Sequence, residues 1–275
     1  MTTSPLPLLG VALTRPDFDA LRDWITGPGR AIEIQDFVGA DVIAGDTDAL
    51  VADWRAALAG HAGPRGIHGP FFGLDLSNPD REIRAVIQRR LLKGLEIAEA
   101  LGGTHMVVHS PFNFWHVLNR DNYPRIHAGM IDAMADCLSP VLARAADVGC
   151  TLMLENIDDT DPQHRADAAR AIGHPNLALS IDTGHATLAH ANYGAPPVVD
   201  FVARAGDLLG HVHLQDVDGH ADRHWHPGEG IIPWPAVFNA LARNPAEPRL
   251  VLEVRDRRDR LPRTVAALEA LGLAR

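Results

Sequence analysis

The amino-acid sequence predicts a (β/α)₈ barrel, the TIM-barrel form of the α/β class, as a single domain over residues 1–275. Short apolar runs, typical of strands, alternate along the chain with longer stretches whose apolar residues recur three and four positions apart, typical of helices. The short runs are almost continuously apolar, as parallel strands covered on both faces are. A length of 275 residues is also close to that of such a barrel.

Eight of the apolar runs are predicted strands: Leu8–Leu13, Ala31–Phe37, Gly66–Phe71, His105–Ser110, Thr151–Ile157, Leu177–Asp182, Gly210–Gln215 and Arg249–Val254. The clearest predicted helices are Asp80–Leu101, Ile126–Val148 and Thr264–Leu271, and another begins near Trp234 after a Pro-Gly turn. The competing architecture, a doubly wound sheet, usually places a glycine-rich phosphate loop after its first strand. Residues 12–16 (Ala-Leu-Thr-Arg-Pro) do not form such a loop.

The composition is that of an ordinary globular protein, with 46% hydrophobic and 22% charged residues. This apolar share can build a sizeable core, which excludes a disordered chain and a disulfide scaffold. No apolar run approaches about 18 residues, so we expect no membrane span. Residues 1–7 lack the regions of a secretion signal, and the two cysteines, Cys137 and Cys150, form no CxxC motif. We therefore expect a cytoplasmic protein with both thiols reduced and buried.

The charge balance argues against a nucleic-acid partner. Lys and Arg number 25 against 35 Asp and Glu, a formal net charge of −10 at pH 7. An acidic chain disfavours a broad phosphate-binding surface. The sequence also holds 15 histidines. Because an imidazole serves both as a metal ligand and as a proton carrier, their placement decides how the site is interpreted.

Five successive predicted strands, the fourth to the eighth, each carry a histidine or a carboxylate at or near their C-terminal end. These residues are His109, Glu155, Asp182, His213 and Glu253. The C-terminal strand ends of a barrel form its active site. Buried carboxylates need a compensating cation, and carboxylates with imidazoles suit Mn²⁺, Co²⁺, Zn²⁺ or Mg²⁺. The set therefore predicts a divalent-metal site, although each residue alone also fits a core histidine or a barrel-mouth ion pair.

Further candidates lie near the same strand ends. His68 lies near the end of the third predicted strand. After the seventh, Asp222 and His224 suit a cation or a substrate, and Arg223 between them is a candidate substrate contact by position; a charged surface loop is the alternative for this segment. Trp115, in the aromatic loop after the fourth strand, is expected to form a lid or an apolar wall for a sugar, or else to pack on the next helix. His211, two residues before His213, is interpreted as structural.

The strand ends resemble the xylose isomerase-like TIM barrel superfamily. The matching segments are Val-Val-His109, Leu-Glu155-Asn156, Ile-Asp182-Thr-Gly-His185, His213-Leu-Gln-Asp216, Pro-Gly-Glu-Gly230 and Leu-Glu253. The resemblance extends from about Leu8 to Leu271. The superfamily includes sugar isomerases and epimerases, dehydratases and endonuclease IV. These motifs therefore identify the superfamily and leave the substrate open.

The resemblance implies a divalent-metal-dependent isomerase or epimerase that acts on a small sugar or keto-sugar. By this resemblance Glu155, Asp182, His213 and Glu253 would hold the metal. Glu155 and Glu253 would also move a proton beside the carbonyl, through a metal-stabilised enediolate. His185 would bind a substrate hydroxyl and assist proton transfer, and His109 is a further candidate substrate contact. Family members are often dimers or tetramers, so a homo-oligomer is expected.

Endonuclease IV supplies the main alternative, a multinuclear zinc phosphodiesterase. Its nine zinc ligands all have counterparts here: His68, His109, Glu155, Asp182, His185, His213, Asp222, His224 and Glu253. One to three ions are therefore expected. Residues 36–50, after the second predicted strand, hold four aspartates and no Lys or Arg. This composition disfavours a clamp on a DNA backbone, so isomerase chemistry ranks first. A metal-dependent dehydratase or lyase and a non-catalytic sugar-binding barrel are the remaining alternatives.

Overall fold

The computed structural model describes residues 6–275, and it confirms the predicted barrel. Residues 1–5, part of the stretch considered for a secretion signal, lie outside the described residues. Eight parallel strands close into a barrel in chain order, with β1 paired to β8. The strands are β1 (Gly10–Leu13), β2 (Ile32–Ile34), β3 (Arg65–His68), β4 (His105–His109), β5 (Thr151–Glu155), β6 (Leu177–Asp182), β7 (Leu209–Leu214) and β8 (Arg249–Leu252).

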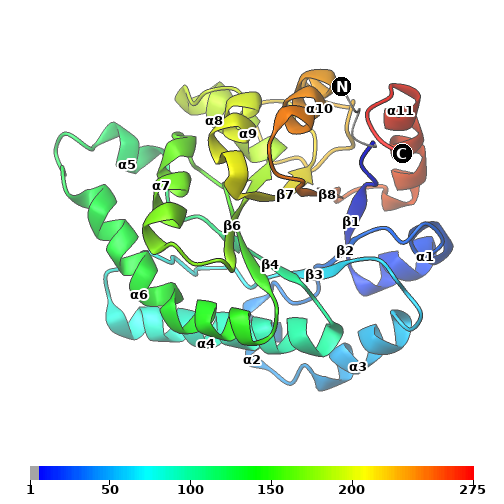
Figure 1. The fold of residues 1–275 in the computed structure, drawn as a ribbon, viewed down its shortest axis with the longest axis horizontal. Coiled ribbons are helices and arrows are strands. Elements are labelled where there is room, and N and C mark those ends of the chain that lie inside the picture. Colours follow the sequence, from blue (N-terminus) through cyan, green and yellow to red (C-terminus); the bar gives the residue numbers. More distant parts are fainter. Residues whose placement is uncertain (1–5) are drawn as a thin grey trace.

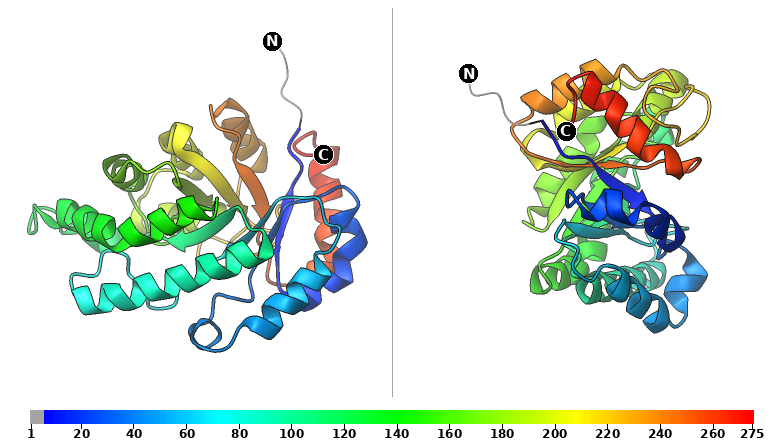
Figure 2. Two further views of the ribbon diagram at one scale, coloured as in Figure 1. Left: turned by 60° about the horizontal axis from the view of Figure 1, so that its bottom comes forward. Right: turned by 90° about the vertical axis from the view of Figure 1, so that its right-hand side faces the viewer.

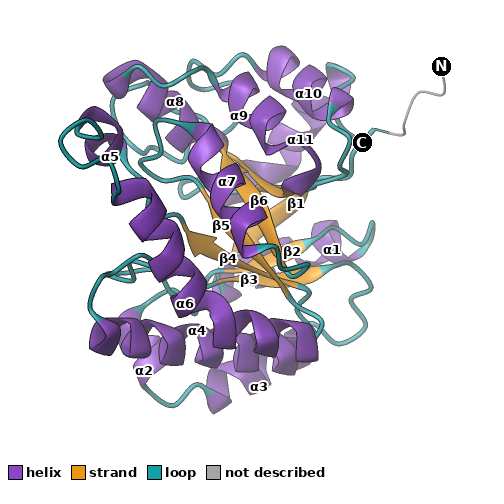
Figure 3. Cartoon of the chain, turned by 60° about the vertical axis from the view of Figure 1, so that its left-hand side comes forward, coloured by secondary structure: helices purple, strands orange, loops and turns teal. Residues whose placement is uncertain are grey.

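Helices surround the strands (Figure 3). They are α1 (Arg15–Thr26), α2 (Ala40–Ala44), α3 (Asp48–Ala57), α4 (Arg81–Leu101), α5 (Phe114–Leu118), α6 (Ile126–Asp147), α7 (Pro162–Ile172), α8 (Thr183–Tyr193), α9 (Val198–Ala205), α10 (Trp234–Arg243) and α11 (Leu261–Ala270), with 3₁₀ turns at Gly206–Leu208 and Arg258–Arg260. The two longest, α4 and α6, lie side by side (Figure 1), and Arg84 of α4 forms a 2.8 Å ion pair with Asp136 of α6.

Local sequence explains where these elements begin and end. Asp80 caps α4 by accepting a hydrogen bond from the backbone of Glu82, and Gly102 ends the helix in the left-handed conformation. The predicted strand Ala31–Phe37 is too long, because β2 ends at Ile34. Beyond it, the Asp36 carboxylate accepts hydrogen bonds from the backbone of Arg15 and the indole of Trp54, both at 2.9 Å. These contacts hold Asp36 outside the sheet, against the residues that follow β1 and against α3.

The barrel register places the strand ends that matter for function. His109 pairs with Glu155, and Asp182 pairs with His213. The β6–β7 register shifts between Leu179 and Ser180, so a local irregularity precedes the paired ends. The polar residues of β4 to β7 therefore lie in adjacent positions at one end of the barrel.

The two ends of the described chain lie next to each other (Figure 2), where the backbone N–H of Arg275 donates to the carbonyl of Pro7 at 3.0 Å. Both cysteines are free and buried, as predicted. Within residues 6–275 no helix is at once long enough and apolar enough to span a membrane.

Candidate metal centre and active site

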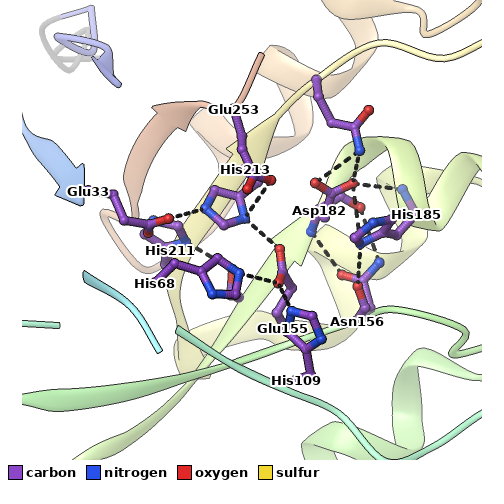
Figure 4. Close-up of polar contacts among 12 residues, drawn as sticks. Glu33, His68, His109, Glu155, Asn156, Asp182, His185, His211, His213 and Glu253 are labelled. Carbon is purple, nitrogen blue, oxygen red and sulfur yellow. Dashed lines mark hydrogen bonds and ion pairs between the residues drawn. The ribbon is translucent and has the colours of Figure 1, made fainter. Parts of the chain in front are cut away.

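Four side chains from successive strands meet at the C-terminal end of the barrel (Figure 4). Glu155 and Asp182 end β5 and β6, His213 lies near the end of β7, and Glu253 follows β8. One ligand atom from each lies within 4.8 Å of the others, and all four residues are buried. Three carboxylates with one imidazole form a donor set suited to a divalent cation. The chemistry of these residues therefore fits the predicted metal.

His213 lies at the centre of this group. Its Nδ1 lies 2.5 Å from Glu155 Oε1 and 3.3 Å from Glu253 Oε2. Its Nε2 lies 2.9 Å from Glu33 Oε1. The other oxygen of Glu253 is also engaged, because Gln35 Nε2 donates to Glu253 Oε1 at 2.5 Å. One imidazole nitrogen thus lies between the two glutamates of the predicted acid–base pair.

Asp182 is held by contacts to both its backbone and its carboxylate. The side-chain amide of Asn156 accepts from Asp182 N at 2.9 Å and donates to Asp182 O at 3.1 Å. The carboxylate caps α8 by accepting from the backbone of His185 at 2.7 Å, and it accepts from Gln215 Nε2 at 3.1 Å. Its orientation is therefore fixed by three neighbouring residues.

A second group shares Glu155. His68 Nε2 lies 3.7 Å and His109 Nε2 3.5 Å from Glu155 Oε2. The ligand atoms of these three residues also lie within 4.8 Å of one another. The Phe71 ring stacks on His109 with the ring centroids 4.2 Å apart. Glu155 therefore stands between two clusters, each with ligands suited to a cation.

A third group consists of His185, Asp222 and His224. His185 Nε2 lies 3.4 Å from Asp222 Oδ1, and His224 Nε2 lies 3.0 Å from Asp222 Oδ2. His224 adopts φ 49°, in the left-handed region, which costs a residue other than glycine roughly 1–2 kcal/mol. Such strained backbone concentrates at functional sites. All nine residues predicted as ligands therefore fall into three neighbouring groups.

The pKa values within the site show that its carboxylates favour positive charge on the neighbouring groups. Burial would raise the pKa of Glu155, but the charge of His213 outweighs burial and holds that pKa well below its usual range. Burial opposes protonation of His213 and His185, yet the surrounding carboxylates raise both pKa values well above the usual range. For Asp182, burial prevails and raises the pKa to about 6. The buried carboxylates therefore carry negative charge that a bound divalent cation would neutralise.

A cavity of about 140 Å³ opens beside the third group. Its lining residues are Ile157, Asp158, His185, Leu188, Ala189, Tyr193 and Asp222. Two further predicted substrate contacts have other neighbours: Trp115, which was expected in a loop but lies on α5, and Arg223 in the segment after β7. Trp115 is 43% exposed and lies against Tyr123, while Arg223 pairs with Asp218 at 2.8 Å and lies over the Trp225 ring. Their roles toward a substrate stay predictions.

Sequence reasoning missed the residues that hold the predicted ligands in place. Glu33 and Gln35 of the second strand region contact His213 and Glu253, while Asn156 and Gln215 hold Asp182. The available signal was a lone glutamate between two isoleucines of a strand, with its side chain on the inner face. A carboxylate in such a position needs a buried partner.

Comparisons with known proteins identify the family of this chain. The model of xylose isomerase-like TIM barrels matches residues 29–274. A fructoselysine 3-epimerase of Escherichia coli O157:H7 is 29% identical over 106 residues, which cover 36% of this chain and 37% of that epimerase, well under two thirds of its length.

Solved structures share the whole fold. A protein of Thermus thermophilus, solved after soaking with ZnCl₂, is 27% identical with a TM-score of 0.72 over 97% of this chain and 99% of that chain. A D-tagatose 3-epimerase-like protein is 22% identical with a TM-score of 0.70, over 88% of this chain and 86% of that chain. Since the family model covers well over half of the residues, this chain belongs to the family of xylose isomerase-like TIM barrels.

Proposed function

We propose that this protein is a divalent-metal-dependent isomerase or epimerase of a small sugar or keto-sugar. The observation that carries the proposal is the placement of Glu155 and Glu253 on either side of His213 Nδ1, with Asp182 completing a buried group of four. The similarity to a fructoselysine 3-epimerase supports the same chemistry. The family and these residues together point to an enzyme that moves a proton next to a carbonyl group.

The proton transfer is carried out by the two glutamates of the site. One glutamate of the pair removes a proton from the carbon beside the carbonyl, and the other delivers a proton to the intermediate. His185, which borders the cavity and faces Asp222, binds a substrate hydroxyl there and orients the sugar. A divalent cation would be held by Glu155, Asp182, His213 and Glu253. When bound, a divalent cation acts as a Lewis acid for negative charge that develops on substrate oxygen.

The proposal is tested by proton exchange at the substrate carbon. The protein, loaded with Mn²⁺, Co²⁺, Zn²⁺ or Mg²⁺, is incubated in D₂O with ketopentoses, ketohexoses and their phosphates, and NMR follows deuterium beside the carbonyl. We expect exchange with at least one sugar, its loss after EDTA dialysis, and its return with the metal. Glu155→Gln and Glu253→Gln should each slow exchange by about 10²–10⁴-fold, the size of a general acid–base contribution.

Glu96→Gln is the matched control, because this glutamate side chain on α4 is 58% exposed and pairs only with Lys93 among the described ion pairs. It should keep the wild-type rate. The metal content of every variant is measured, since Glu155 and Glu253 are also ligands. A near-native rate in Glu155→Gln with its metal retained would contradict the proposed role of that glutamate. Elimination of water from the same sugars would reassign the chemistry to a dehydratase or lyase.

A multinuclear zinc phosphodiesterase is the second candidate. The three ligand groups, two of which share Glu155, favour it specifically, because neighbouring cations can clamp both the attacking and the leaving oxygen of a phosphodiester. The loop after β2 argues against a DNA substrate. Asp41, Asp46 and Asp48 are exposed there, and residues 36–50 contain no Lys, Arg or His. This composition repels a nucleic-acid backbone.

Incubation of the zinc-loaded protein with duplex DNA that contains an abasic site decides between the two candidates. We expect no incision at protein concentrations that give full sugar exchange. Efficient incision that is lost in His185→Asn, together with no exchange on any sugar, would replace the proposed function with the second candidate.

A further inference from the structure

Glu33 occupies an unusual position, in the middle of β2 and inside the barrel. Its carboxylate is fully buried and faces three imidazoles. His213 Nε2 lies 2.9 Å from Oε1, while His105 Nε2 at 3.1 Å and His211 Nε2 at 3.2 Å share Oε2. Glu33 and His213 therefore connect β2 to β7 across the barrel interior (Figure 4). We call Glu33, His105, His211 and His213 the inner cluster.

The partners of the inner cluster determine where its protons lie. The Arg249 guanidinium, which can only donate, points at His105 Nδ1. That nitrogen is therefore an acceptor, and His105 carries its proton on Nε2, toward Glu33. His211 Nδ1 lies 2.9 Å from the hydroxyl of Ser180, which can donate to it in the same way. The contact of His211 Nε2 with Glu33 is close but poorly aligned.

The position of the His213 proton also follows from its hydrogen-bond partners, and it links the inner cluster to the metal centre. Both oxygens of Glu33 face imidazole nitrogens, because Oε1 lies against His213 Nε2, and Oε2 lies against Nε2 of His105 and of His211. Carboxylate oxygens accept hydrogen bonds, so His213 presents its N–H at Nε2, toward Glu33. Its other nitrogen, Nδ1, is the one that faces Glu155 and Glu253. When a cation takes the place of the Nδ1 proton, the remaining proton of His213 is the one that Glu33 holds.

We infer that Glu33 is a positioning residue for the metal centre: its contact with His213 Nε2 holds the ring and its proton so that Nδ1 is free for the cation. The inference rests on the proposed metal-dependent function. Carboxylates that accept from the distal nitrogen of a metal-ligating histidine raise its basicity and fix its orientation, and their loss weakens metal binding by about 10–100-fold.

A second cation held by Glu33, His211 and His213 is the competing interpretation, since their ligand atoms also lie within 4.8 Å of one another. It would require His213 to give up both ring protons and bridge two ions. It would also place the ion next to the N–H of His105. Because Arg249 donates to His105 Nδ1, this N–H is on Nε2 and points at Glu33. The hydrogen-bond assignment needs neither condition, so the observations favour it.

The test compares Glu33→Gln with His105→Gln by calorimetric titration of the EDTA-treated proteins with Zn²⁺ and Mn²⁺. Both substitutions remove one member of the inner cluster and keep a polar amide in its place, but only Glu33→Gln disrupts the contact with His213. We expect binding about 10–100-fold weaker in Glu33→Gln, and within about threefold of wild type in His105→Gln. Circular dichroism establishes that each variant is folded. Should Glu33→Gln fail to fold, Glu33→Asp, which shortens the reach, is expected to show the same weakening.

Long-range ¹H–¹⁵N NMR of the histidine rings gives a second readout that a purely structural role would not change. In the Zn²⁺-loaded wild type, His213 should carry its proton on Nε2, and Glu33→Gln should broaden or shift that signal while the His105→Gln protein keeps it. Equal weakening of metal binding in both variants would overturn the positioning role. Loss of one bound ion with unchanged affinity for the rest would assign a second cation to the inner cluster instead. A wild-type protein that binds no divalent ion would overturn the inference and the proposed function together, whereas wild-type metal binding with an unchanged Glu33→Gln affinity would overturn the inference alone.

Discussion

Asp159 and Arg165 form a buried ion pair that supports the strand ends of the site. Arg165 Nε lies 2.9 Å from Asp159 Oδ1, and Ser110 Oγ donates to the same oxygen at 2.9 Å. The Arg165 Nη1 group donates to the carbonyls of Leu154 and Ser180 at 2.9 and 2.6 Å. Arg165 thereby joins β5 to β6 immediately below Glu155 and Asp182. Neither residue belongs to the ligand groups of the site, so the effect of substituting Asp159 is measured as a change in stability.

Asp159 makes stability depend on pH. Burial, opposed by Arg165 and by the hydrogen bond of Ser110, raises its pKa from 3.8 to about 6. Because the folded state holds this proton more tightly than the unfolded state, the contribution of Asp159 is fully present below about pH 4 and is lost as the pH rises through about 6. Relative to Asp159→Asn, which cannot titrate, the free energy of unfolding of the wild type should fall by up to about 1.4 kcal/mol per pH unit over this interval.

Urea unfolding of both proteins at several pH values between about 4 and 7 measures this difference. Asp207→Asn, on a side chain that is 81% exposed, is the control and should leave the pH profile of the wild type unchanged. A difference between wild type and Asp159→Asn that stays constant with pH would contradict the raised pKa.

Single residues also show where sequence reasoning reaches its limit. His109, Glu155, Asp182, His213 and Glu253 could be identified because each polar residue interrupts an apolar strand at its end. The contacts of Glu33 could not be identified, because its partners come from other strands and the pairing depends on how the closed barrel places inner side chains opposite one another. Strand periodicity gives the face of a residue, but it does not give its neighbour across the barrel.

At the scale of elements, the junction of β6 with α8 gives Asp182-Thr-Gly-His185 its pattern. Asp182 is at once a strand end and the N-cap of α8. A Cβ added to Gly184 would overlap the side-chain amide of Gln215, and this buried amide donates to Asp182 and Asp222. The absence of a side chain at Gly184 thus lets the helix approach the amide that orders two ligand groups.

Gly184→Ala is therefore expected to reverse the usual effect of this substitution in a helix. Alanine normally stabilises a helix relative to glycine by about 0.5–1 kcal/mol, and Gly129→Ala in α6, where an added Cβ meets nothing within 4 Å, should do so. Gly184→Ala should instead destabilise the protein by about 1–3 kcal/mol, the cost of an overpacked core. Urea unfolding measures both. Equal stabilisation of the two variants would show that Gln215 can move without cost.

The element boundaries show which local signals were sufficient. The helices Arg81–Leu101 and Ile126–Asp147 lie within one residue of their predicted bounds, because apolar periodicity and, for the first, Asp80 and Gly102 mark the ends. Strand ends were less predictable. Thr151–Ile157 was expected, yet β5 ends at Glu155, since the Asn156 side chain takes over the pairing with Asp182. When a side chain forms the hydrogen bonds that a backbone would otherwise form, the hydropathy pattern does not show it.

On the scale of the whole molecule, the candidate ligands are divided unevenly around the barrel. The group of four comes from β5, β6, β7 and the residue after β8, and His213 connects it to Glu33 of β2 on the opposite side. A bound cation would therefore tie together strands that are distant in sequence. Because it binds the folded chain and finds no preformed site in an unfolded one, its binding free energy adds to the free energy of unfolding.

Removal of the metal should accordingly lower the stability of the entire barrel. At a free ion concentration of about 100 times the Kd, linkage adds about 2.7 kcal/mol, which corresponds to a rise in Tm of roughly 5–10 °C for a domain of this size. Differential scanning calorimetry of EDTA-treated and reloaded protein measures the shift. Hydrogen exchange should slow most in β5 to β8, where the ligands lie. Asp182→Asn, which lacks one ligand charge, should lose most of the shift, while Glu96→Gln on the surface should keep it. An equal shift in both variants would mean that the ion binds elsewhere. An unchanged Tm with every metal would mean that no cation binds at this site.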